Sequence, residues 1–310
     1  MLMLILYVLE QTKLNYFITD LQPFSIIVDC CILGFQNKKN DKNYDFKIIN
    51  NDFKTKNIFN IELFKNNRNN IFKAIFNPNI LEKINSVETK LDDFVLINRG
   101  VNIGGCFADF LSEKKINKKY KKYISGTKCI KPYIYNWEKE DGYMVFDKKI
   151  ENKLRKKGKT LALGQHKRFK NKKLFIPESS QELMAVYSNE LCYSAYGIMV
   201  ATKKNKDIKL KVVLAFLNSK LLRYYVVKYE ILRKGKKATP HIGVKGLRSI
   251  PIPVINISNQ IKIINLVNEI IDLKENKENT DHLENKLNYM IYKSYNLTKK
   301  EIKIIENETI

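Results

Sequence analysis

Clustered cysteine and histidine are missing from this 310-residue chain. Its five cysteines contain no CxxC pair, and its three histidines (His166, His241 and His282) lie far apart. Structural zinc sites need closely spaced thiolates and imidazoles, and secreted disulfide scaffolds need a dense set of cysteines. The sequence therefore predicts no metal site and no disulfide framework, and it indicates that the thiols are buried as small apolar groups.

Long hydrophobic runs are missing as well. The segment 1–10 (MLMLILYVLE) is apolar but short, with no basic residue before it and no small-residue cleavage site after it. A membrane-spanning helix needs about 20 apolar residues, and a signal peptide needs a basic region ahead of its apolar stretch. We therefore expect no membrane partner and a cytoplasmic location.

The common catalytic motifs are not found either. There is no HExxH and no GxSxG, and the glycines of 99–110 do not follow the GxGxxG or GxxxxGK[ST] spacing of phosphate-binding loops. A tight turn is the better interpretation of that segment, because glycine permits positive φ and close backbone approach. The tripeptide 88–90 (ETK) matches the end of a metal-nuclease pattern, but so short a match arises by chance in a lysine-rich chain. No catalytic residue is predicted.

Acidic residues are too few to balance the basic ones. Lysine and arginine number 56 against 32 aspartates and glutamates, which gives a formal net charge of +24. Such an excess favours a polyanionic partner, nucleic acid above all. An A/T-rich genome offers a second explanation, because the chain is crowded with Lys, Asn, Ile, Tyr and Phe.

The basic residues gather in three clusters, 114–131, 148–173 and 203–248, that flank short apolar runs. Lysine and arginine release counterions when they contact phosphates, and arginine can read guanine edges. We expect base contacts from the loop 229–248 and from the segment before Lys173. The residues predicted to contact DNA are Lys128, Lys131, Tyr133, Lys167, Arg168, Lys172, Arg233, Lys234, Lys236, Lys237, His241, Lys245 and Arg248.

Short apolar runs predict strands in the N-terminal part of the chain. The run 25–35 is continuously apolar and 44–49 alternates, so together they predict a hairpin at the edge of a sheet. The polar segment that follows predicts a linker with helical patches at 59–64 and 71–76.

The rest of the chain predicts strands and helices in alternation. Strands are expected at 94–97, 107–110, 143–146, 174–177, 198–201 and, as an edge strand because of its prolines, 250–253. Helices are expected at 182–191 and 210–227. Further helices follow an N-cap at Ser258, with a capping box of Thr298 and Glu301 near the end.

Three segments in order, 174–180 (LFIPESS), 214–222 (LAFLNSKLL) and 250–253 (IPIP), resemble the TaqI-like C-terminal specificity domain. That domain is the target-recognition module of adenine-N6 DNA methyltransferases, including type IIG restriction–modification enzymes. The segments 99–107, 124–133 and 287–301 are similar to further blocks of the family, so the resemblance covers residue 91 to the C-terminus.

The N-terminal part is similar to the last strands of an adenine methyltransferase domain, through 28–35 (VDCCILGF) and the polar turn after it. The family's [DNS]-Pro-Pro-[Tyr/Phe] motif is missing, with Asn77-Pro78-Asn79 as the nearest string, and no Gly-rich S-adenosylmethionine loop is found. The resemblance therefore implies that this chain holds no cofactor and does not methylate DNA alone. S-adenosylmethionine would bind the missing methyltransferase part.

These observations predict a mixed α/β (α+β) fold and a sequence-specific DNA-recognition module. Its expected partners are double-stranded DNA and a methyltransferase or nuclease polypeptide. Two alternatives stay open: an active adenine methyltransferase or endonuclease with diverged motifs, and a basic interaction protein without sequence preference. The expected domains are a methyltransferase remnant at 1–50 with a β-hairpin, a helical linker at 51–90, a target-recognition domain at 91–257 and C-terminal helices at 258–310.

Overall fold

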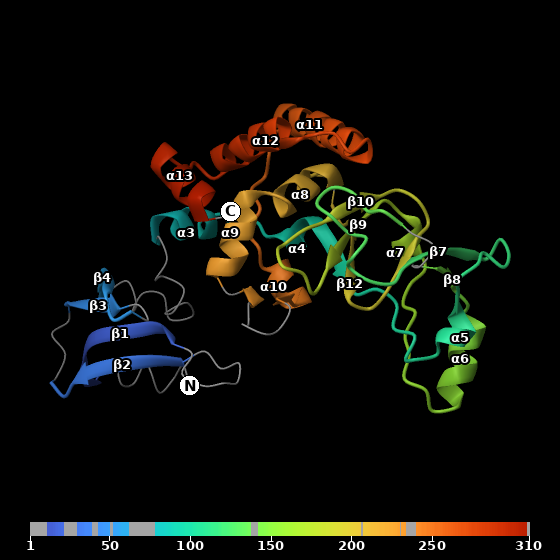
Figure 1. Ribbon diagram of the computed structural model, residues 1–310, viewed down its shortest axis with the longest axis horizontal. Helices are drawn as coiled ribbons and strands as arrows, with labels where there is room; N and C mark the ends of the chain where they lie inside the picture. The colour runs from blue at the N-terminus through green and yellow to red at the C-terminus, as the bar shows by residue number, and fades with distance from the viewer. Residues whose placement is uncertain are drawn as a thin grey trace. The chain divides into compact units, whose positions relative to one another are not determined.

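The computed structural model describes residues 11–21, 30–38, 43–49, 52–61, 78–137, 142–205, 207–229, 231–233 and 240–308. The chain divides into two compact units. The first unit comprises Met1–Leu81 and Gly235–Ala238, and the second comprises Glu82–Lys234 and Thr239–Ile310 (Figure 1). In these described ranges no helix has the length and apolarity needed to cross a lipid bilayer.

The first unit contains a sheet with the strand order β2-β1-β3-β4. Its strands are β1 (Lys13–Leu21), β2 (Cys30–Gln36), β3 (Asp45–Ile49) and β4 (Thr55–Asn60). The β1–β3 pair is parallel, while β1–β2 and β3–β4 are antiparallel. Alternation along β3 buries Phe46 and Ile48, so this strand has one core face and one exposed face.

The hairpin predicted from 25–35 and 44–49 is wrong, because β1 lies between β2 and β3 and pairs with both. Irregular register in the β1–β2 pair, between Leu14 and Tyr16 and after Ile18, hides β1 from a search for strict alternation. Residues 25–29 lie outside the described residues. Of the predicted helical patch at 59–64, Phe59 and Asn60 end β4, Ile61 is helical, and 62–64 lie outside the described residues, as does 71–76.

The central sheet of the second unit has the order β10-β9-β12-β5 and is antiparallel throughout. Its strands are β5 (Val95–Asn98), β9 (Lys173–Pro177), β10 (Val186–Ser188) and β12 (Ile198–Lys203). All of β9 and the first four residues of β12 are buried. Strands covered on both faces read as continuous apolar runs, which explains why the predictions at 174–177 and 198–201 hold to within two residues. The prediction at 94–97 holds to within one residue, although β5 alternates between buried and exposed positions.

A smaller sheet, of order β11-β7-β8-β6, carries the basic helices. It is formed by β6 (Leu111–Ser112), β7 (Tyr120–Ile124), β8 (Tyr143–Val145) and β11 (Tyr193–Ser194). The short helices around it are α5 (Phe107–Phe110), α6 (Lys148–Lys156) and α7 (Lys167–Lys170). One core joins this sheet to the central one, with Phe110, Met144 and Phe169 packed in the same cluster as Phe175 and Val200.

The glycine segment forms the predicted turn. Gly104 and Gly105 have φ values of 56° and 77°, and a Cβ at Gly104 would lie 2.1 Å from the Thr160 carbonyl oxygen. The strand expected after it, at 107–110, is instead the single-turn helix α5, whose Phe110 is buried.

The helix predicted at 210–227 is two helices, α8 (Leu210–Leu217) and α9 (Lys220–Lys228). Asn218 and Ser219 separate the two helices. The Ser219 hydroxyl accepts a hydrogen bond from the Leu222 N–H at 3.2 Å and caps α9. The buried Asn218 amide accepts from the Ala185 N–H at 2.8 Å and donates to the Ala185 carbonyl at 3.0 Å. This pair of bonds holds Ala185 extended next to β10, so the helix predicted at 182–191 is wrong.

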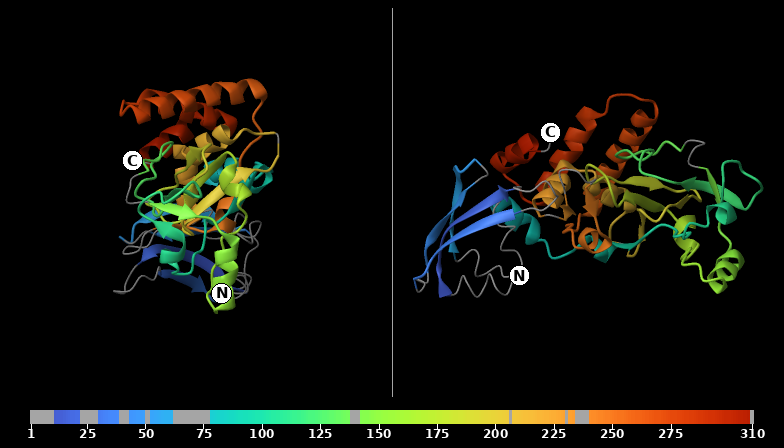
Figure 2. Two further views of the ribbon diagram at one scale, coloured as in Figure 1. Left: turned by 90° about the vertical axis from the view of Figure 1, so that its right-hand side faces the viewer. Right: turned by 60° about the horizontal axis from the view of Figure 1, so that its bottom comes forward.

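The C-terminal helices are α11 (Ile257–Glu275), α12 (Asp281–Ser294) and α13 (Lys299–Glu308). Figures 1 and 2 show α11 and α12 as a layer over α8. The N-cap of α11 is Asn256 rather than the predicted Ser258, because the Asn256 side chain accepts from the Asn259 N–H at 2.9 Å. The segment 250–253 forms one isolated bridge, Lys90 to Pro251, instead of a strand.

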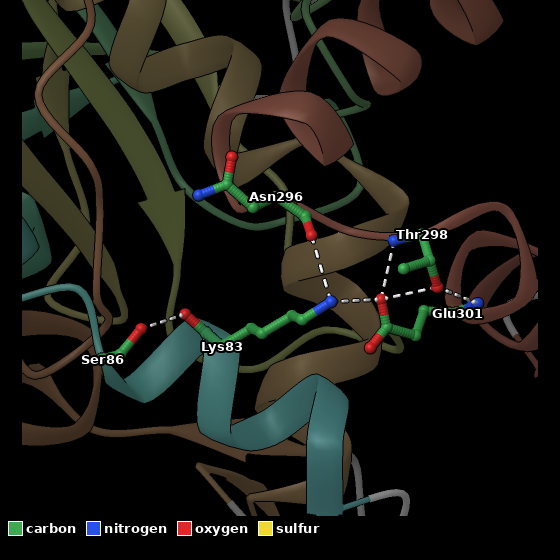
Figure 3. A network of polar contacts seen from close by, with 5 residues as sticks. All are labelled: Lys83, Ser86, Asn296, Thr298 and Glu301. Carbon is green, nitrogen blue, oxygen red and sulfur yellow. Dashed lines mark hydrogen bonds and ion pairs between the residues drawn. The ribbon is translucent and has the colours of Figure 1, made fainter.

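The second unit contains further helices, of which α4 and α10 lie next to β5. They are α4 (Leu91–Phe94), α10 (Val244–Arg248) and the end of α3 (Pro78–Asn85). Figure 3 shows how α3 reaches α13: the Lys83 ammonium donates to Glu301 at 2.8 Å and to the Asn296 carbonyl at 3.1 Å. Glu301 also accepts from the Thr298 N–H at 2.6 Å, which confirms the predicted capping box.

Candidate nucleic-acid interface

Helix α6 presents a dense group of exposed cations. Asp147 caps it by accepting hydrogen bonds from the N–H groups of Lys149 at 2.7 Å and Ile150 at 3.3 Å. Its one acid, Glu151, is 3% exposed and faces inward, where it accepts from the Leu163 N–H at 3.1 Å and pairs with Lys148 at 2.5 Å. The exposed basic residues of the helix and its C-terminal end are Lys148, Lys149, Lys153, Arg155, Lys156 and Lys157.

A shallow depression of about 400 Å³ follows one side of α6. It is lined by lysines and Asn152, and no aspartate or glutamate contributes to it. Because the acid of this helix is turned inward and the cations outward, α6 presents a surface of one sign. Such a surface fits a phosphate backbone.

Aromatic rings lie at the base of this basic surface. Phe146, directly before the α6 N-cap, stacks on Tyr193 with ring centroids 5.6 Å apart and an interplanar angle of 24°. His166 lies 5.0 Å from Phe146 and shares a 3.0 Å hydrogen bond with the Tyr193 hydroxyl. Burial and the neighbouring Lys170 lower the pKa of His166, which favours the neutral imidazole.

Helix α7 contains two of the predicted contact residues, and they have different surroundings. Lys167 is exposed, as a phosphate contact requires. Arg168 is half-buried and donates to the carbonyls of Leu163 at 3.1 Å and Gly100 at 3.3 Å. Its guanidinium also lies over the Phe169 ring, 4.7 Å from the centroid. Arg168 therefore braces the loop before α7 against the glycine turn.

The predicted contact residues of the segment 128–133 also differ in their exposure. Lys128 and Lys131 are exposed, but the Tyr133 ring is 3% exposed. The Tyr133 N–H donates to the Ala185 carbonyl at 3.1 Å, and its backbone has a φ of 75°. Burial, with a smaller effect of Glu284, raises the pKa of its hydroxyl well above the ordinary value. This arrangement leaves no face of Tyr133 open to a base.

A two-stranded hairpin, β13 (Leu232–Arg233) and β14 (His241–Ile242), carries the third predicted group. Arg233 pairs with His241 through its backbone. His241 is exposed, with Nδ1 3.3 Å from the Ser179 hydroxyl and Nε2 3.5 Å from Glu178. Lys234, Lys236 and Lys237, which lie between β13 and β14 in the sequence, are outside the described residues.

Glu178 anchors the base of the hairpin. Its carboxylate is buried and pairs with Arg99, whose guanidinium lies 4.6 Å from the centre of the Tyr196 ring. The Ile242 N–H donates to the Glu178 carbonyl at 2.8 Å. The described part of β13 and β14 is therefore fixed to the end of β9.

The residues that follow the hairpin differ in their freedom to bind DNA. Lys245 is exposed on α10. Arg248 donates to the Ile97 carbonyl at 2.7 Å and lies 3.3 Å from an Asp92 oxygen, so it joins α10 to β5 and α4. Lys172 belongs to a different surface, which it shares with Lys203, Lys209 and Lys211.

The structure brings Lys167 near the start of the basic helix α6, because the neighbouring His166 ring lies against Phe146. Other predicted contact residues also lie at the surface: Lys128, Lys131, Lys172, Lys245 and His241. Sequence reasoning identified the basic cluster 148–173, which contains the lysines of α6, but did not name these lysines among the predicted contact residues. Among the described residues no group of three or more His, Cys, Asp or Glu side chains lies close enough to hold a metal ion.

Residues 121–252 match the family model of the TaqI-like C-terminal specificity domain. No curated protein is similar enough in sequence to match the chain. Among solved structures, the type IIL restriction–modification enzyme MmeI in complex with DNA is similar, with a TM-score of 0.53 and 12% identity over 99% of this chain and 47% of MmeI. The type IIG restriction endonuclease BpuSI matches with a TM-score of 0.44 and 11% identity over 94% of this chain and 45% of BpuSI.

The HsdS subunit from Thermoanaerobacter tengcongensis matches more weakly, with a TM-score of 0.34 and 10% identity over 76% of this chain and 53% of HsdS. The chain spans about half the length of these structures. The likeness to MmeI bears on the fold alone, and it agrees with the mixed α/β class predicted from the sequence. The resemblance to the TaqI-like C-terminal specificity domain is confirmed for residues 121–252.

Proposed function

We propose that this chain recognises a specific DNA sequence as the target-recognition part of a restriction–modification enzyme. The observation that carries the proposal is the family match of residues 121–252, which includes β7, α6, α7, the hairpin and the two helices of the LNSKLL segment. The excess of 56 basic residues over 32 acidic residues supplies the non-specific attraction to DNA that such a role requires. No observation favours the two alternatives.

In this proposal α6 and the exposed lysines Lys128, Lys131 and Lys167 contact phosphates. Such contacts fix the register of the protein on the duplex without carrying sequence information. The β13–β14 hairpin, with Arg233, Lys234, Lys236, Lys237 and His241, reads base edges. Its anchored base supports this role, because a reading loop needs a rigid mount while its tip adapts to the groove.

The catalytic half of the reaction belongs elsewhere in this proposal. An adenine methyltransferase or nuclease part carries the [DNS]-Pro-Pro-[Tyr/Phe] motif and binds S-adenosylmethionine, and the first unit of this chain contributes strands to it. Base flipping needs a pocket that holds the extruded adenine, and the recognition part positions that pocket over its target. DNA binding also fits the cytoplasmic location expected from the sequence.

A selection from a randomised duplex pool tests the proposal. The purified chain is used alone and together with a methyltransferase polypeptide that carries the missing motifs. We expect a short motif to be enriched, with the same motif in both arms. Enrichment of no motif in either arm contradicts the proposal. Methylation of adenine by the chain alone would instead support the diverged-enzyme alternative.

A further inference from the structure

A depression of about 640 Å³ on the second unit gathers four lysines. Its lining includes Lys172, Lys203, Lys209 and Lys211 and contains no aspartate or glutamate. It shares no residue with α6 or with the β13–β14 hairpin.

The topology brings these lysines together from separate segments. Lys172 directly precedes β9 and Lys203 ends β12, and the antiparallel pairing of Lys173 with Thr202 places both at one end of the central sheet. Lys209 is the N-cap residue of α8, and Lys211 lies in its first turn. Helix α11 completes the depression with Ile264 and Asn268.

The charge of these lysines is not neutralised nearby. None of the four forms an ion pair within the part of the chain that the structure describes, whereas eleven other pairs are formed there. The Lys211 ammonium donates to the Asn268 side chain and lies over the Tyr187 ring, 4.9 Å from its centroid. Burial and the neighbouring Lys172 lower the pKa of Lys211, and only Asp272 acts in the opposite direction.

The first turn of α8 adds backbone donors to this surface. It contains no acidic residue. Within the described residues, the structure gives no acceptor to the N–H groups of Leu210 and Lys211, both of which line the depression. The N–H groups in the first turn of a helix favour an anion, and four ammonium groups around this turn add to that preference.

We propose that this depression binds phosphate groups. The phosphates come either from the backbone of bound DNA, in which case the site rests on the proposed function, or from a free nucleotide or pyrophosphate. Lysine is suited to both, because its ammonium is a compact point charge that does not require one bidentate geometry.

The test compares two triple variants of the full chain. One replaces Lys172, Lys203 and Lys209 with glutamine, and the matched control replaces the exposed Lys286, Lys300 and Lys303 of α12 and α13, so that both lose the same charge. Lys211 is left in place because of its interactions with Asn268 and Tyr187. Thermal unfolding followed by circular dichroism verifies that both variants fold.

Two probes are applied to each variant: a salt series of binding to a duplex of arbitrary sequence, and calorimetric titration with pyrophosphate. If DNA phosphates occupy the site, the slope of log K against log salt falls by about 0.9 for each phosphate that the depression variant no longer neutralises, while the control keeps its slope. If a free phosphate ligand occupies it, pyrophosphate binding disappears in the depression variant alone and the duplex slopes stay equal.

Equal behaviour of the two variants in both probes overturns the proposal. Failure of the proposed function is a separate outcome. If the chain shows no sequence preference for DNA, the pyrophosphate titration still tests whether the depression binds phosphate. If the chain binds its motif while both variants behave alike, the proposed function stands and the phosphate site is contradicted.

Discussion

Glu301 is the residue on which three segments of the second unit meet. Its carboxylate accepts from the Lys83 ammonium at 2.8 Å, from the Thr298 N–H at 2.6 Å and from the Thr298 hydroxyl at 2.9 Å (Figure 3). Burial opposes ionisation of this group, but these hydrogen bonds outweigh it and lower the pKa of Glu301. The ionised form therefore stabilises the junction of α3 with α13.

We expect Glu301→Gln to lower the free energy of unfolding by about 1 to 2 kcal/mol at pH 7. A carboxyl whose pKa is lower in the folded protein stabilises it above the unfolded pKa, and this contribution is lost as the pH falls through the folded value. The difference between wild type and variant, measured by urea unfolding, should therefore shrink below about pH 4.5. A difference that stays constant down to pH 3 contradicts this account.

Lys173 is a buried basic residue whose charged form, unlike that of Glu301, is disfavoured in the folded protein. It is fully buried at the start of β9 and donates to the Glu190 carbonyl at 2.5 Å. Burial lowers its pKa to about 8, with Cys192 and Glu190 acting the other way. Between pH 8 and the ordinary lysine value near 10.5, the unfolded chain holds a proton that the folded chain has released. In that window the stability contributed by this residue rises with pH.

The Lys173→Met variant isolates this effect, because methionine has a similar length and does not titrate. We expect the stability of wild type relative to the variant to increase by about 3 kcal/mol between pH 8 and 10.5. Chemical unfolding at several pH values measures it. The tyrosines titrate in both proteins and cancel in the comparison, whereas the Lys173 charge lowers the pKa of Cys192, so this thiol is coupled to the substitution. A flat difference would show that Lys173 is solvated or already neutral.

Single residues also show why contact sites are hard to predict from a sequence. Lys167 and Arg168 are neighbours with the same charge, yet one is exposed and the other donates to two backbone carbonyls. Tyr133 follows a basic run, as an aromatic base contact would, but its ring is in the core. The difference depends on which groups lie across the fold, and the carbonyls of Gly100 and Ala185 come from segments more than 30 positions away.

At the scale of elements, α6 is the helix that the proposed function depends on most. Its inward acid and outward cations make it a one-sided basic surface. We expect replacement of Lys149, Lys153 and Lys156 with glutamine to weaken DNA binding uniformly across sequences. The slope of log K against log salt should fall by about 0.9 for each phosphate that is no longer neutralised.

Fluorescence anisotropy over a salt series measures this change on two unrelated duplexes. The variant with Lys286, Lys300 and Lys303 replaced has the same net charge and serves as control. Exposed substitutions of this kind alter stability by less than about 0.5 kcal/mol each, so both variants should keep their unfolding midpoints. Equal slopes for the two variants would remove α6 from the interface.

Elements were predictable where local pattern and tertiary packing agree. Strands β9 and β12 are continuously apolar because both faces are covered, and the capping box of α13 is a local motif. Strand β1 was missed because its register is irregular. The false helix at 182–191 had the right composition, but the Asn218 side chain, 33 positions away from Ala185, holds that backbone extended.

At the scale of the whole molecule, two compact units share one chain. The second unit contains the specificity-domain match, apart from residues 235–238, together with the C-terminal helices. The resemblance to the specificity domain was sufficient to predict the mixed α/β fold class from the sequence, and the net charge favoured a polyanionic partner. The placement of individual cations was not predictable, because it follows from the way β9, β12, α8 and α11 meet.

One titration tests sequence-specific DNA recognition by this chain most directly. The chain is titrated against a duplex that carries the selected motif and against a scrambled duplex of equal length and composition, at several salt concentrations. We expect parallel, linear dependence of log K on log salt, with the motif bound at least about 10³-fold more tightly. Equal affinity for the two duplexes at every salt concentration would contradict the claim and leave a protein that is merely basic.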